Sequence, residues 1–402
     1  MKSVAVVGSG WSGAIVSRAL ASSGVTVELF EARDHIAGNC HTEARNGTTI
    51  HTYGPHIFHT DYQIVREFME SWTAFHSYEH RVKASTDRGL FSLPINLHTI
   101  CQLEGKVLSP DEARNVVKNR KEHRSGTSFE DYLIRNLGRE IYDLFFQDYT
   151  TKQWGRHPSE LPESIAKRLP IRYDFNDSYF HHEFQGIPVA GYTPIFERLL
   201  DHEKITIYMS SAVDRKSLLG EYDKVVWSGG LDSYFDFEAG VLPYRTLDFE
   251  WFSFEGDWQG CAQLNHCSGI VPFTRTTEYK YFEPKRTETA SVISREFSRE
   301  AGPMDEPYYP IRMNSDETMF KYYTDLASRE KNTAFVGRLA SFRYLDMDQT
   351  IHDALSFSTK VVKLLNSNEF LHGVWGPEND AYSEGLNSQE EGWIRRALFG
   401  NS

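Results

Sequence analysis

Three glycines near the start of the chain have the spacing of a dinucleotide-binding turn. Gly8, Gly10 and Gly13 form a Gly-x-Gly-x-x-Gly pattern, and an acidic residue, Glu31, follows further along. The first glycine permits a tight turn, the second lets backbone N–H groups approach a pyrophosphate, and the third allows close helix–strand packing. A carboxylate at Glu31 accepts hydrogen bonds from ribose hydroxyls. The pattern predicts binding of NAD or FAD; an ordinary glycine-rich turn is the alternative.

The elements that must position this turn can be identified around it. The apolar run 4–7 predicts a strand, 11–23 a helix and 25–30 a second strand. This is the order of a Rossmann-like unit, in which the helix N-terminus faces the pyrophosphate. Near the other end of the chain, 335–339 returns a strand to the cofactor, a layout more typical of FAD enzymes than of NAD dehydrogenases.

Composition narrows the class of protein. The chain has 402 residues, enough for two or three domains, with 40% hydrophobic and 25% charged residues, as in soluble globular proteins. A net charge of -13 argues against a nucleic-acid partner. Four scattered cysteines without CxxC spacing argue against structural zinc, any other metal site or a disulfide framework, and fit a reducing cytoplasm. No signal peptide or membrane-spanning run is present, so we expect a cytoplasmic protein.

Several segments, in order, resemble the UDP-galactopyranose mutase family of flavoenzymes. Among them are Tyr53-Gly-Pro-His-Ile-Phe-His-Thr60, Tyr149-Thr-Thr-Lys-Gln-Trp-Gly155 and Val271-Pro-Phe-Thr-Arg-Thr-Thr-Glu278. The resemblance runs from residue 3 to about 363. The other segments are 8–13, 34–39, 91–97, 167–170, 184–188, 307–310 and 337–347.

The resemblance implies an α/β fold made of a discontinuous Rossmann-like FAD-binding domain, an inserted helical domain and an antiparallel β-sheet domain of six strands. We assign 1–78, 189–238 and 318–365 to the FAD-binding domain, and 97–170, with a mobile substrate loop, to the helical domain. The ranges 79–96, 171–188 and 239–317 form the sheet domain. The tail 366–402 has no assigned structure.

The resemblance also implies an unusual isomerase activity, the interconversion of UDP-galactopyranose and UDP-galactofuranose by an intramolecular transferase. Reduced FAD attacks the anomeric carbon through N5, UDP leaves, the sugar ring opens and recloses through its 4-hydroxyl, and UDP returns. There is no net redox change. The products serve cell-surface glycans such as the cell wall or O-antigen.

Residues that match the family's motifs acquire roles through this resemblance. Arg168 and Arg275 would hold the diphosphate, because a guanidinium suits phosphate oxygens. His59 would face the flavin, where its charge would favour the anionic reduced form, and we count it with the two arginines as catalytic. The expected substrate-binding residues are His80, Phe145, Phe146, Tyr149, Trp154, Arg168, Tyr179, Asn265, Arg275, Tyr309, Tyr344 and Asp346.

Within that set, Phe145, Phe146 and Tyr149 would stack on uracil, although such a helical stripe is ordinarily core. Trp154 would lie against the sugar, and the three other tyrosines would donate hydroxyls to the diphosphate. The expected cofactor-binding residues are Gly8, Ser9, Gly10, Trp11, Ser12, Gly13, Glu31, Ala32, Arg33, Gly38, Asn39, Tyr53, His56, Ile57, Val213, Arg338, Tyr344, Leu345, Asp346 and Met347.

Two positions depart from the family's pattern. His80 stands where some members carry asparagine against the sugar, and Ala37 stands where the pattern has glycine. His80 leaves the sugar open, so UDP-N-acetylgalactosamine or dTDP-fucose are alternative substrates. An FAD-dependent oxidoreductase resembling amine oxidases and a flavin-binding protein without catalysis stay open as well. The resemblance further implies a homodimer and an external reductant such as NADPH or a flavin reductase.

Overall fold

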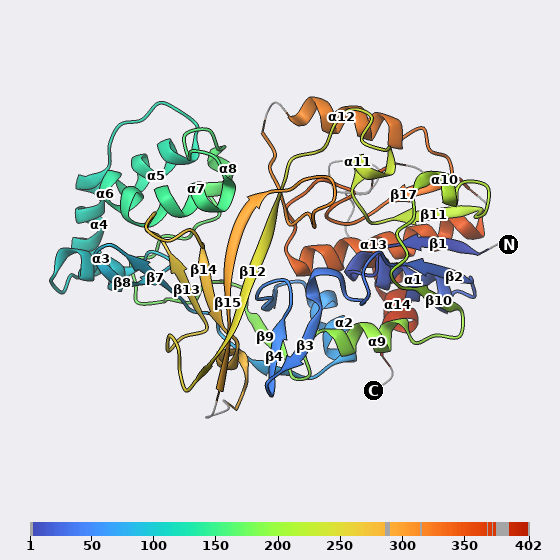
Figure 1. The fold of residues 1–402 in the computed structure, drawn as a ribbon, viewed down its shortest axis with the longest axis horizontal. Coiled ribbons are helices and arrows are strands. Elements are labelled where there is room, and N and C mark those ends of the chain that lie inside the picture. The colour runs from blue at the N-terminus through green and yellow to red at the C-terminus, as the bar shows by residue number, and fades with distance from the viewer. Residues whose placement is uncertain are drawn as a thin grey trace.

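A parallel sheet of five strands forms the centre of one half of the molecule (Figure 1). The structure is a computed structural model that describes residues 3–285, 290–313, 316–367, 369–371, 373–374 and 386–400. The strands, in spatial order, are β10 (Ile205–Tyr208), β2 (Val27–Phe30), β1 (Val4–Val7), β11 (Lys224–Trp227) and β17 (Thr333–Phe335).

Helices cover both faces of this sheet because its strands bury side chains on both sides. Val4 and Val6 of β1 point into one apolar cluster, while Ala5 points into another. The first cluster is closed by α1 (Trp11–Ser22), α2 (Gln63–Trp72), α9 (Thr193–Leu200) and α13 (Met347–Asn366). The second is closed by α10 (Arg215–Leu218), α11 (Leu231–Tyr234) and α12 (Asp316–Ala327).

The strands of the parallel sheet come from three distant parts of the chain. β1 and β2 lie near the start, β10 and β11 lie in the middle, and β17 lies after residue 332. The predicted α/β class with a discontinuous Rossmann-like domain is therefore confirmed. The exact domain limits proposed from the sequence stay a prediction.

A second, larger sheet runs through the middle of the molecule. Its order is β16 (Tyr309–Pro310), β12 (Tyr244–Glu255), β15 (Ala290–Glu300), β14 (Arg275–Glu278), β13 (Gln263–His266), β7 (Val82–Thr86) and β8 (Gly89–Leu93). The long pair β12 and β15 forms its spine (Figure 1).

This sheet differs from the expected six antiparallel strands. It has seven strands in the described residues, and β7 pairs with β13 in parallel. Parallel neighbours require a long crossover between them. Here the crossover includes the whole helical region, so this pairing is a consequence of the insertion.

The helical region packs at the far end of that sheet, around its own apolar cluster (Figure 1). Two of its helices start at capping boxes, in which Asn96 and Ser109 bind the backbone of the first turn. Its elements are α3 (Leu97–Glu104), α4 (Pro110–Arg120), α5 (Phe129–Leu137), α6 (Arg139–Tyr142), the π-helical turn η2 (Asp143–Gln147), α7 (Asp148–Trp154) and α8 (Glu163–Ala166).

Two small sheets and two short 3-10 helices join these parts. β3 (Thr42–Arg45) pairs with β4 (Thr48–His51), and β9 (Phe184–Pro188) lies between β5 (Phe58–Thr60) and β6 (Phe75–Ser77). The 3-10 helices are η1 (Gly38–Cys40), in the loop that follows β2, and η3 (Tyr279–Phe282).

The last described part of the chain is helical, which the sequence did not predict. Helix α14 (Ser388–Leu398) packs against α1, α2 and α13. The indole N–H of Trp72 donates to the carbonyl of Leu398 at 3.0 Å, and the N–H of Gly400 donates to the Ser71 hydroxyl at 3.1 Å. Residues 375–385 lie outside the described part.

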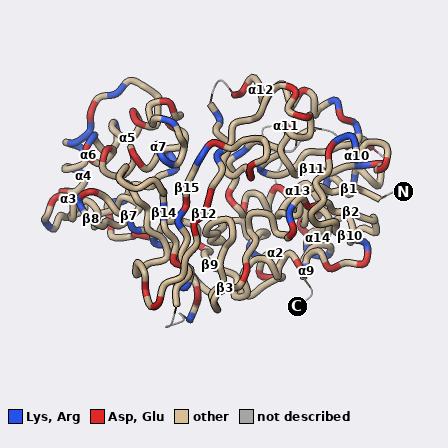
Figure 2. The backbone as a smooth tube through the Cα atoms, in the orientation of Figure 1, with Lys and Arg blue, Asp and Glu red and all other residues tan. Residues whose placement is uncertain are grey.

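Charged side chains of both signs are interspersed along the chain (Figure 2). None of the described helices is long and apolar enough to cross a membrane.

Candidate active site

The glycine-rich turn has the geometry that its sequence predicts. Gly8 has a φ of +91°, and a Cβ there would collide with the hydroxyl of Ser228 on the neighbouring strand connection. A Cβ on Gly13 would meet the carbonyl oxygen of Gly8. The turn therefore requires glycine at both positions, and it delivers the chain directly into α1 at Trp11. Ser12 and Gly13 lie in the first turn of that helix, whose N–H groups have no partner within the helix.

Glu31 is fixed beside this turn at the end of β2. One carboxylate oxygen accepts hydrogen bonds from the Ser9 N–H (2.9 Å) and hydroxyl (2.5 Å), and the other from the Arg33 N–H (2.9 Å). The side chain is buried. Glu31 thus bridges the glycine-rich turn and the loop that follows β2.

Arg33 lies next to Glu31 and joins two distant segments. It forms an ion pair with Glu306 and donates to the Asn39 side-chain oxygen at 2.8 Å. Its guanidinium stacks over the Tyr53 ring at 4.3 Å. The Nη1 atom is buried and has no hydrogen-bond partner among the described residues, so it is a donor available to a polar ligand.

The loop after β2 folds over the start of α1. A Cβ on Gly38 would lie 3.1 Å from the Cα of Gly10, so two glycine backbones face each other. Ala37 has a left-handed φ of 79°, a conformation that the family's usual glycine adopts more readily. These glycines, the helix N-terminus, Glu31 and the free donor of Arg33 fit a dinucleotide.

The remaining predicted cofactor residues differ in exposure and in the clusters that they contact, and their contact with a cofactor stays a prediction. Val213 packs against the second apolar cluster, and its segment is tied to β2 because Ser211 N–H donates to the Glu31 carbonyl. Ala32 is exposed, whereas Ile57 and Leu345 are buried. Met347 is the first residue of α13, and Asp346 is its N-cap.

Gly337 carries Arg338 to the glycine-rich turn. Its φ is +96°, and a Cβ there would lie 2.6 Å from the Ser12 hydroxyl. The Arg338 charge helps burial lower the pKa of His56 to about 4, so His56 is neutral. The His56 Nδ1 lies 2.7 Å from the Gly54 carbonyl oxygen. Arg275 also contributes to this shift, so His56 lies near both Arg338 and Arg275.

Arg275, the first residue of β14, is held by a carboxylate on the neighbouring strand. Its Nε donates to Glu296 at 2.7 Å, and Nη2 approaches the Tyr309 hydroxyl at 3.4 Å. Burial alone would lower the pKa of Arg275, but Glu296 and the nearby tyrosines raise it well above its usual value. The partly buried Arg275 is therefore a permanent cation, with one edge of its guanidinium unused by Glu296.

An aromatic stack extends from this arginine to a second one. The Tyr309 and Tyr344 rings stack at 5.6 Å with 17° between their planes, and Arg168 lies over the Tyr344 ring at 4.2 Å. Trp154 lies 6.5 Å from Tyr309. The two arginines predicted to hold a diphosphate are thus joined by two of the tyrosines predicted to assist them.

Other predicted substrate residues surround Arg275. Asn265 lies directly opposite it on β13, and its side-chain oxygen accepts from Gln263 at 2.9 Å. The Arg275 charge acts on the hydroxyls of Tyr149 and Tyr179, whose pKa values are raised by burial. His80 meets the Tyr179 ring at 5.6 Å, edge to face. Burial, with a contribution from Arg275, lowers the pKa of His80 to about 3.

The protein groups around His59 disfavour the charge that the resemblance implies, and that charge beside a bound flavin stays a prediction. Its ring stacks on Phe180 at 3.8 Å, and its Nδ1 lies 3.0 Å from Nδ1 of His182. Burial, with the neighbouring histidines, lowers the pKa of His59 to about 3. The imidazole is therefore neutral near pH 7, because a proton would be both desolvated and close to a second imidazole. Its contact with the flavin stays a prediction.

Phe145 and Phe146 occupy the π-helical turn η2, so they are not spaced as on a regular α-helix. Both are buried in the cluster of the helical region, and Phe145 packs edge to face on Phe91 at 5.2 Å. Tyr149, in contrast, lies near Arg275. Stacking of the two phenylalanines on uracil stays a prediction.

The sequence did not reveal Glu296, Glu306 and Phe180, which contact Arg275, Arg33 and His59 respectively. Ser294, Glu296 and Ser298 alternate along β15, and this pattern indicates a polar inward face that could have pointed to Glu296. Glu306 and Phe180 carried no local signal, since each acts on a residue far away in sequence.

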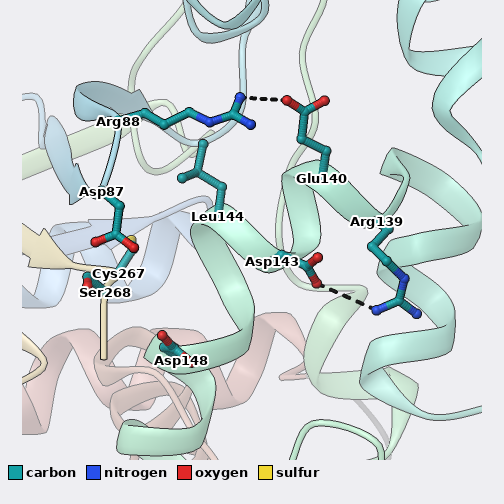
Figure 3. A pocket seen from close by; sticks show the side chains of 9 residues that line it. All are labelled: Asp87, Arg88, Arg139, Glu140, Asp143, Leu144, Asp148, Cys267 and Ser268. Carbon is teal, nitrogen blue, oxygen red and sulfur yellow. Dashed lines mark hydrogen bonds and ion pairs between the residues drawn. The ribbon is translucent and has the colours of Figure 1, made fainter. Parts of the chain in front are cut away.

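A cavity of about 560 Å³ lies between the helical region and the turns that follow β7 and β13 (Figure 3). It is lined by Asp87, Arg88, Arg139, Glu140, Asp143, Leu144, Asp148, Cys267 and Ser268, none of which was predicted to bind substrate or cofactor. In the described residues no group of three or more histidine, cysteine or acidic side chains could hold a metal ion.

Comparisons with known proteins cover almost the whole chain. The family model for UDP-galactopyranose mutase matches residues 144–344, and a model for an NAD(P)-binding Rossmann-like domain matches residues 6–72. The Klebsiella pneumoniae protein named "Probable UDP-galactopyranose mutase" is 45% identical over 384 residues, covering 94% of this chain and 97% of its own. The dTDP-fucopyranose mutase of Escherichia coli is 42% identical over 373 residues, covering 90% and 99%.

The fold agrees with these matches. A crystal structure of reduced UDP-galactopyranose mutase superposes with a TM-score of 0.70 at 15% identity, covering 94% of this chain and 99% of that one. The matched range 144–344 contains both arginines and the stacked tyrosines, and the Rossmann-like match contains the glycine-rich turn. By sequence and by fold, the chain belongs to the UDP-galactopyranose mutase family.

Proposed function

We propose that the protein is a flavin-dependent isomerase that interconverts UDP-galactopyranose and UDP-galactofuranose, for the synthesis of cell-surface glycans. The observation that carries this proposal is the cluster of Arg275, Tyr309, Tyr344 and Arg168. A nucleotide sugar presents a diphosphate, and two guanidinium groups with phenolic donors suit its oxygens.

The proposed cofactor is FAD in its reduced form. When bound, it would supply N5 as a nucleophile that displaces UDP from the anomeric carbon. The first turn of α1 would hold the pyrophosphate and Glu31 a ribose. The buried, unpartnered Nη1 of Arg33 supports a polar group beside that ribose. Arg338 and Asp346 would lie near the isoalloxazine ring.

The arginines would act on charge that develops on UDP as its bond to the sugar breaks. Arg275 is fixed by Glu296, so it needs no reorganisation to meet the diphosphate. Arg168 is exposed and would close on the diphosphate from the other side. The Tyr309 hydroxyl stays protonated, because burial raises its pKa.

A second candidate substrate is dTDP-fucose, because the Escherichia coli relative named for it is 42% identical over 90% of this chain. UDP-N-acetylgalactosamine is a third candidate. An oxidoreductase resembling amine oxidases is disfavoured, because a simple amine does not require two arginines.

The test is turnover by the purified yellow protein with UDP-galactofuranose, with and without dithionite, followed as UDP-galactopyranose by chromatography. We expect turnover only after reduction. Equal turnover by the oxidised protein would contradict the proposed chemistry. The same assay with dTDP-fucofuranose and the N-acetyl analogue side by side ranks the substrates by kcat/KM.

The proposal includes an external reductant such as NADPH or a flavin reductase, and a homodimer. All four cysteines are free, which fits a reducing cytoplasm. Anaerobic reduction of the flavin by NADPH, and the mass in solution by light scattering, check these two points.

A further inference from the structure

The ammonium of Lys152, on α7 one turn after Asp148, is enclosed by backbone carbonyls. Nζ donates to the carbonyl oxygens of Ser268 (2.7 Å), His266 (2.8 Å), Val271 (3.1 Å) and Phe273 (3.1 Å). An ammonium has three N–H bonds, so these four acceptors share them. No carboxylate among the described residues forms an ion pair with Lys152, and burial lowers its pKa.

Asp148 binds the same segment from its N–H side. Its carboxylate accepts from the Gly269 N–H at 2.8 Å. Opposite charges four residues apart lie on one face of a helix and can pair with each other. Here both side chains bind the turn 266–273 instead. Figure 3 shows Asp148 on its helix, with Cys267 and Ser268 at the neighbouring edge of the cavity.

The turn 266–273 leads straight to the diphosphate arginine. It connects β13, which ends at His266, to β14, which begins at Arg275. Arg275 is two residues beyond Phe273, whose carbonyl Lys152 binds. A shift of the turn relative to α7 would therefore move Arg275 as well.

Helix α7 carries the aromatic side of the site. Tyr149 and Trp154 belong to it, and its C-terminal end is tied to the central sheet. There the carbonyl of Gln153 accepts from Ser298 Oγ at 2.7 Å and from Arg245 Nε at 3.1 Å. Lys152 thus links the helix that carries Tyr149, expected at the uracil, to the turn that leads to Arg275, expected at the diphosphate.

We propose that Lys152, assisted by Asp148, is a positioning residue that fixes the distance between Tyr149 of α7, expected at the uracil, and Arg275. This inference rests on the proposed function, because it concerns a ligand that carries both a uridine and a diphosphate. A misplacement of about 1 Å at such a site can cost about a hundredfold in rate. The hydrogen bonds of Lys152 to four carbonyl oxygens hold the whole turn, whereas one ion pair would hold a single side chain.

The experiment compares two probes, uridine and UDP, on the FAD-loaded protein by ligand-observed NMR titration. The variant is Lys152→Met, and Lys118→Met, at an exposed lysine of α4, is the matched control. We expect Lys152→Met to lower UDP affinity at least tenfold, change uridine affinity less than twofold and retain FAD. Lys118→Met should change neither affinity. Equal losses for both probes, or no loss for UDP, would overturn the proposal.

A double-mutant cycle tests whether Lys152 acts through Arg275. In an Arg275→Lys background, Lys152→Met should lower UDP affinity by less than a further threefold. The reason is that Arg275→Lys has already reduced the contribution of residue 275 to UDP binding. A full, independent tenfold loss would show that Lys152 acts elsewhere.

Two further results separate the possible failures. If Lys152→Met cannot be recovered with FAD, Asp148→Ala replaces it, and we expect a threefold loss of affinity for UDP and none for uridine. Equal effects on the two probes would refute the positioning role of Lys152 and Asp148. A wild-type protein that binds no UDP would count against the proposed function. A wild-type protein that binds UDP no better than Lys152→Met would count only against the positioning role of Lys152.

Discussion

The guanidinium carbon of Arg168 lies 4.2 Å from the centre of the Tyr344 ring, and Tyr344 in turn stacks on Tyr309. A cation over an exposed aromatic ring contributes only about 0.5–1 kcal/mol. Among the described residues the Arg168 side chain makes no ion pair, so its N–H groups are available to a ligand. The weak contact holds Arg168 beside the site, and Arg168 can leave the Tyr344 ring with a small loss of free energy.

Arg168→Ala should therefore weaken substrate binding and leave the fold intact. We expect KM for UDP-galactofuranose to rise about tenfold and the free energy of unfolding to change by less than about 1 kcal/mol, because an exposed contact is lost. Steady-state kinetics and urea denaturation measure the two effects. Arg156→Ala, in the same segment and also exposed, is the control and should behave as wild type.

Arg275→Lys should lower kcat on the order of a hundredfold while FAD is retained. The lysine keeps a cation for Glu296, so no buried carboxylate is left unpaired, but it loses the fork that binds two phosphate oxygens. Arg275→Ala is less informative, because an unpaired Glu296 would cost about 3–5 kcal/mol of stability. Arg299→Lys, at an exposed ion pair on β15, is the control; a comparable loss there would contradict the assignment.

Ala37→Gly should stabilise the protein by up to about 1 kcal/mol. The left-handed φ of 79° strains an alanine by about 1–2 kcal/mol, and the greater freedom of glycine when unfolded offsets about half of that. Urea denaturation measures the difference. Ala113→Gly, at a buried position of the regular helix α4, should instead destabilise by about 1 kcal/mol or more. Similar losses in both variants would show that Ala37 is not strained.

Stability should fall as the pH drops below about 6.5. Burial lowers the pKa to about 3 for His51, His59 and His80 and to about 4 for His56. Unfolded histidine titrates near 6.5. Between about pH 6.5 and 4 the unfolded state therefore binds protons that the folded state excludes, which costs up to ~1.4 kcal/mol per pH unit for each histidine. Above this window the stabilisation is fully present.

Urea denaturation at pH 7.5, 6.0 and 5.0 measures that slope. His80→Asn removes one such group, so its free energy of unfolding should depend less steeply on pH than that of the wild type. An unchanged slope would mean that His80 is not buried in its neutral form.

Local patterns predicted the parts of the site that are local in space. Gly8, Gly13 and Glu31 act within one strand–turn–helix–strand unit, so their spacing was enough to identify the cofactor region. The pairing of Arg275 with Glu296 depends on the register of two strands, which residue types alone do not determine. The neutrality of His59 depends on His182, which approaches it only through the pairing of β5 with β9.

Helix α14 shows the same limit at the level of the fold. Its residues Trp393, Ile394 and Leu398 carry an apolar signal, but the surface that they cover belongs to α1, α2 and α13. Only the tertiary structure shows that this surface needs a cover. The π-helical turn at Phe145 and Phe146 was missed for a different reason: its sequence periodicity does not differ visibly from that of an α-helix.

The scattered origin of the parallel sheet has a consequence for biosynthesis. The central strand β1 pairs on one side with β2, which the ribosome makes soon afterwards, and on the other with β11, which begins only at Lys224. At about 5–20 residues per second, synthesis of the roughly 220 residues between β1 and β11 takes on the order of 10–45 s. During this time one edge of β1 has no partner strand, so the nascent chain is expected to depend on chaperones until β11 emerges.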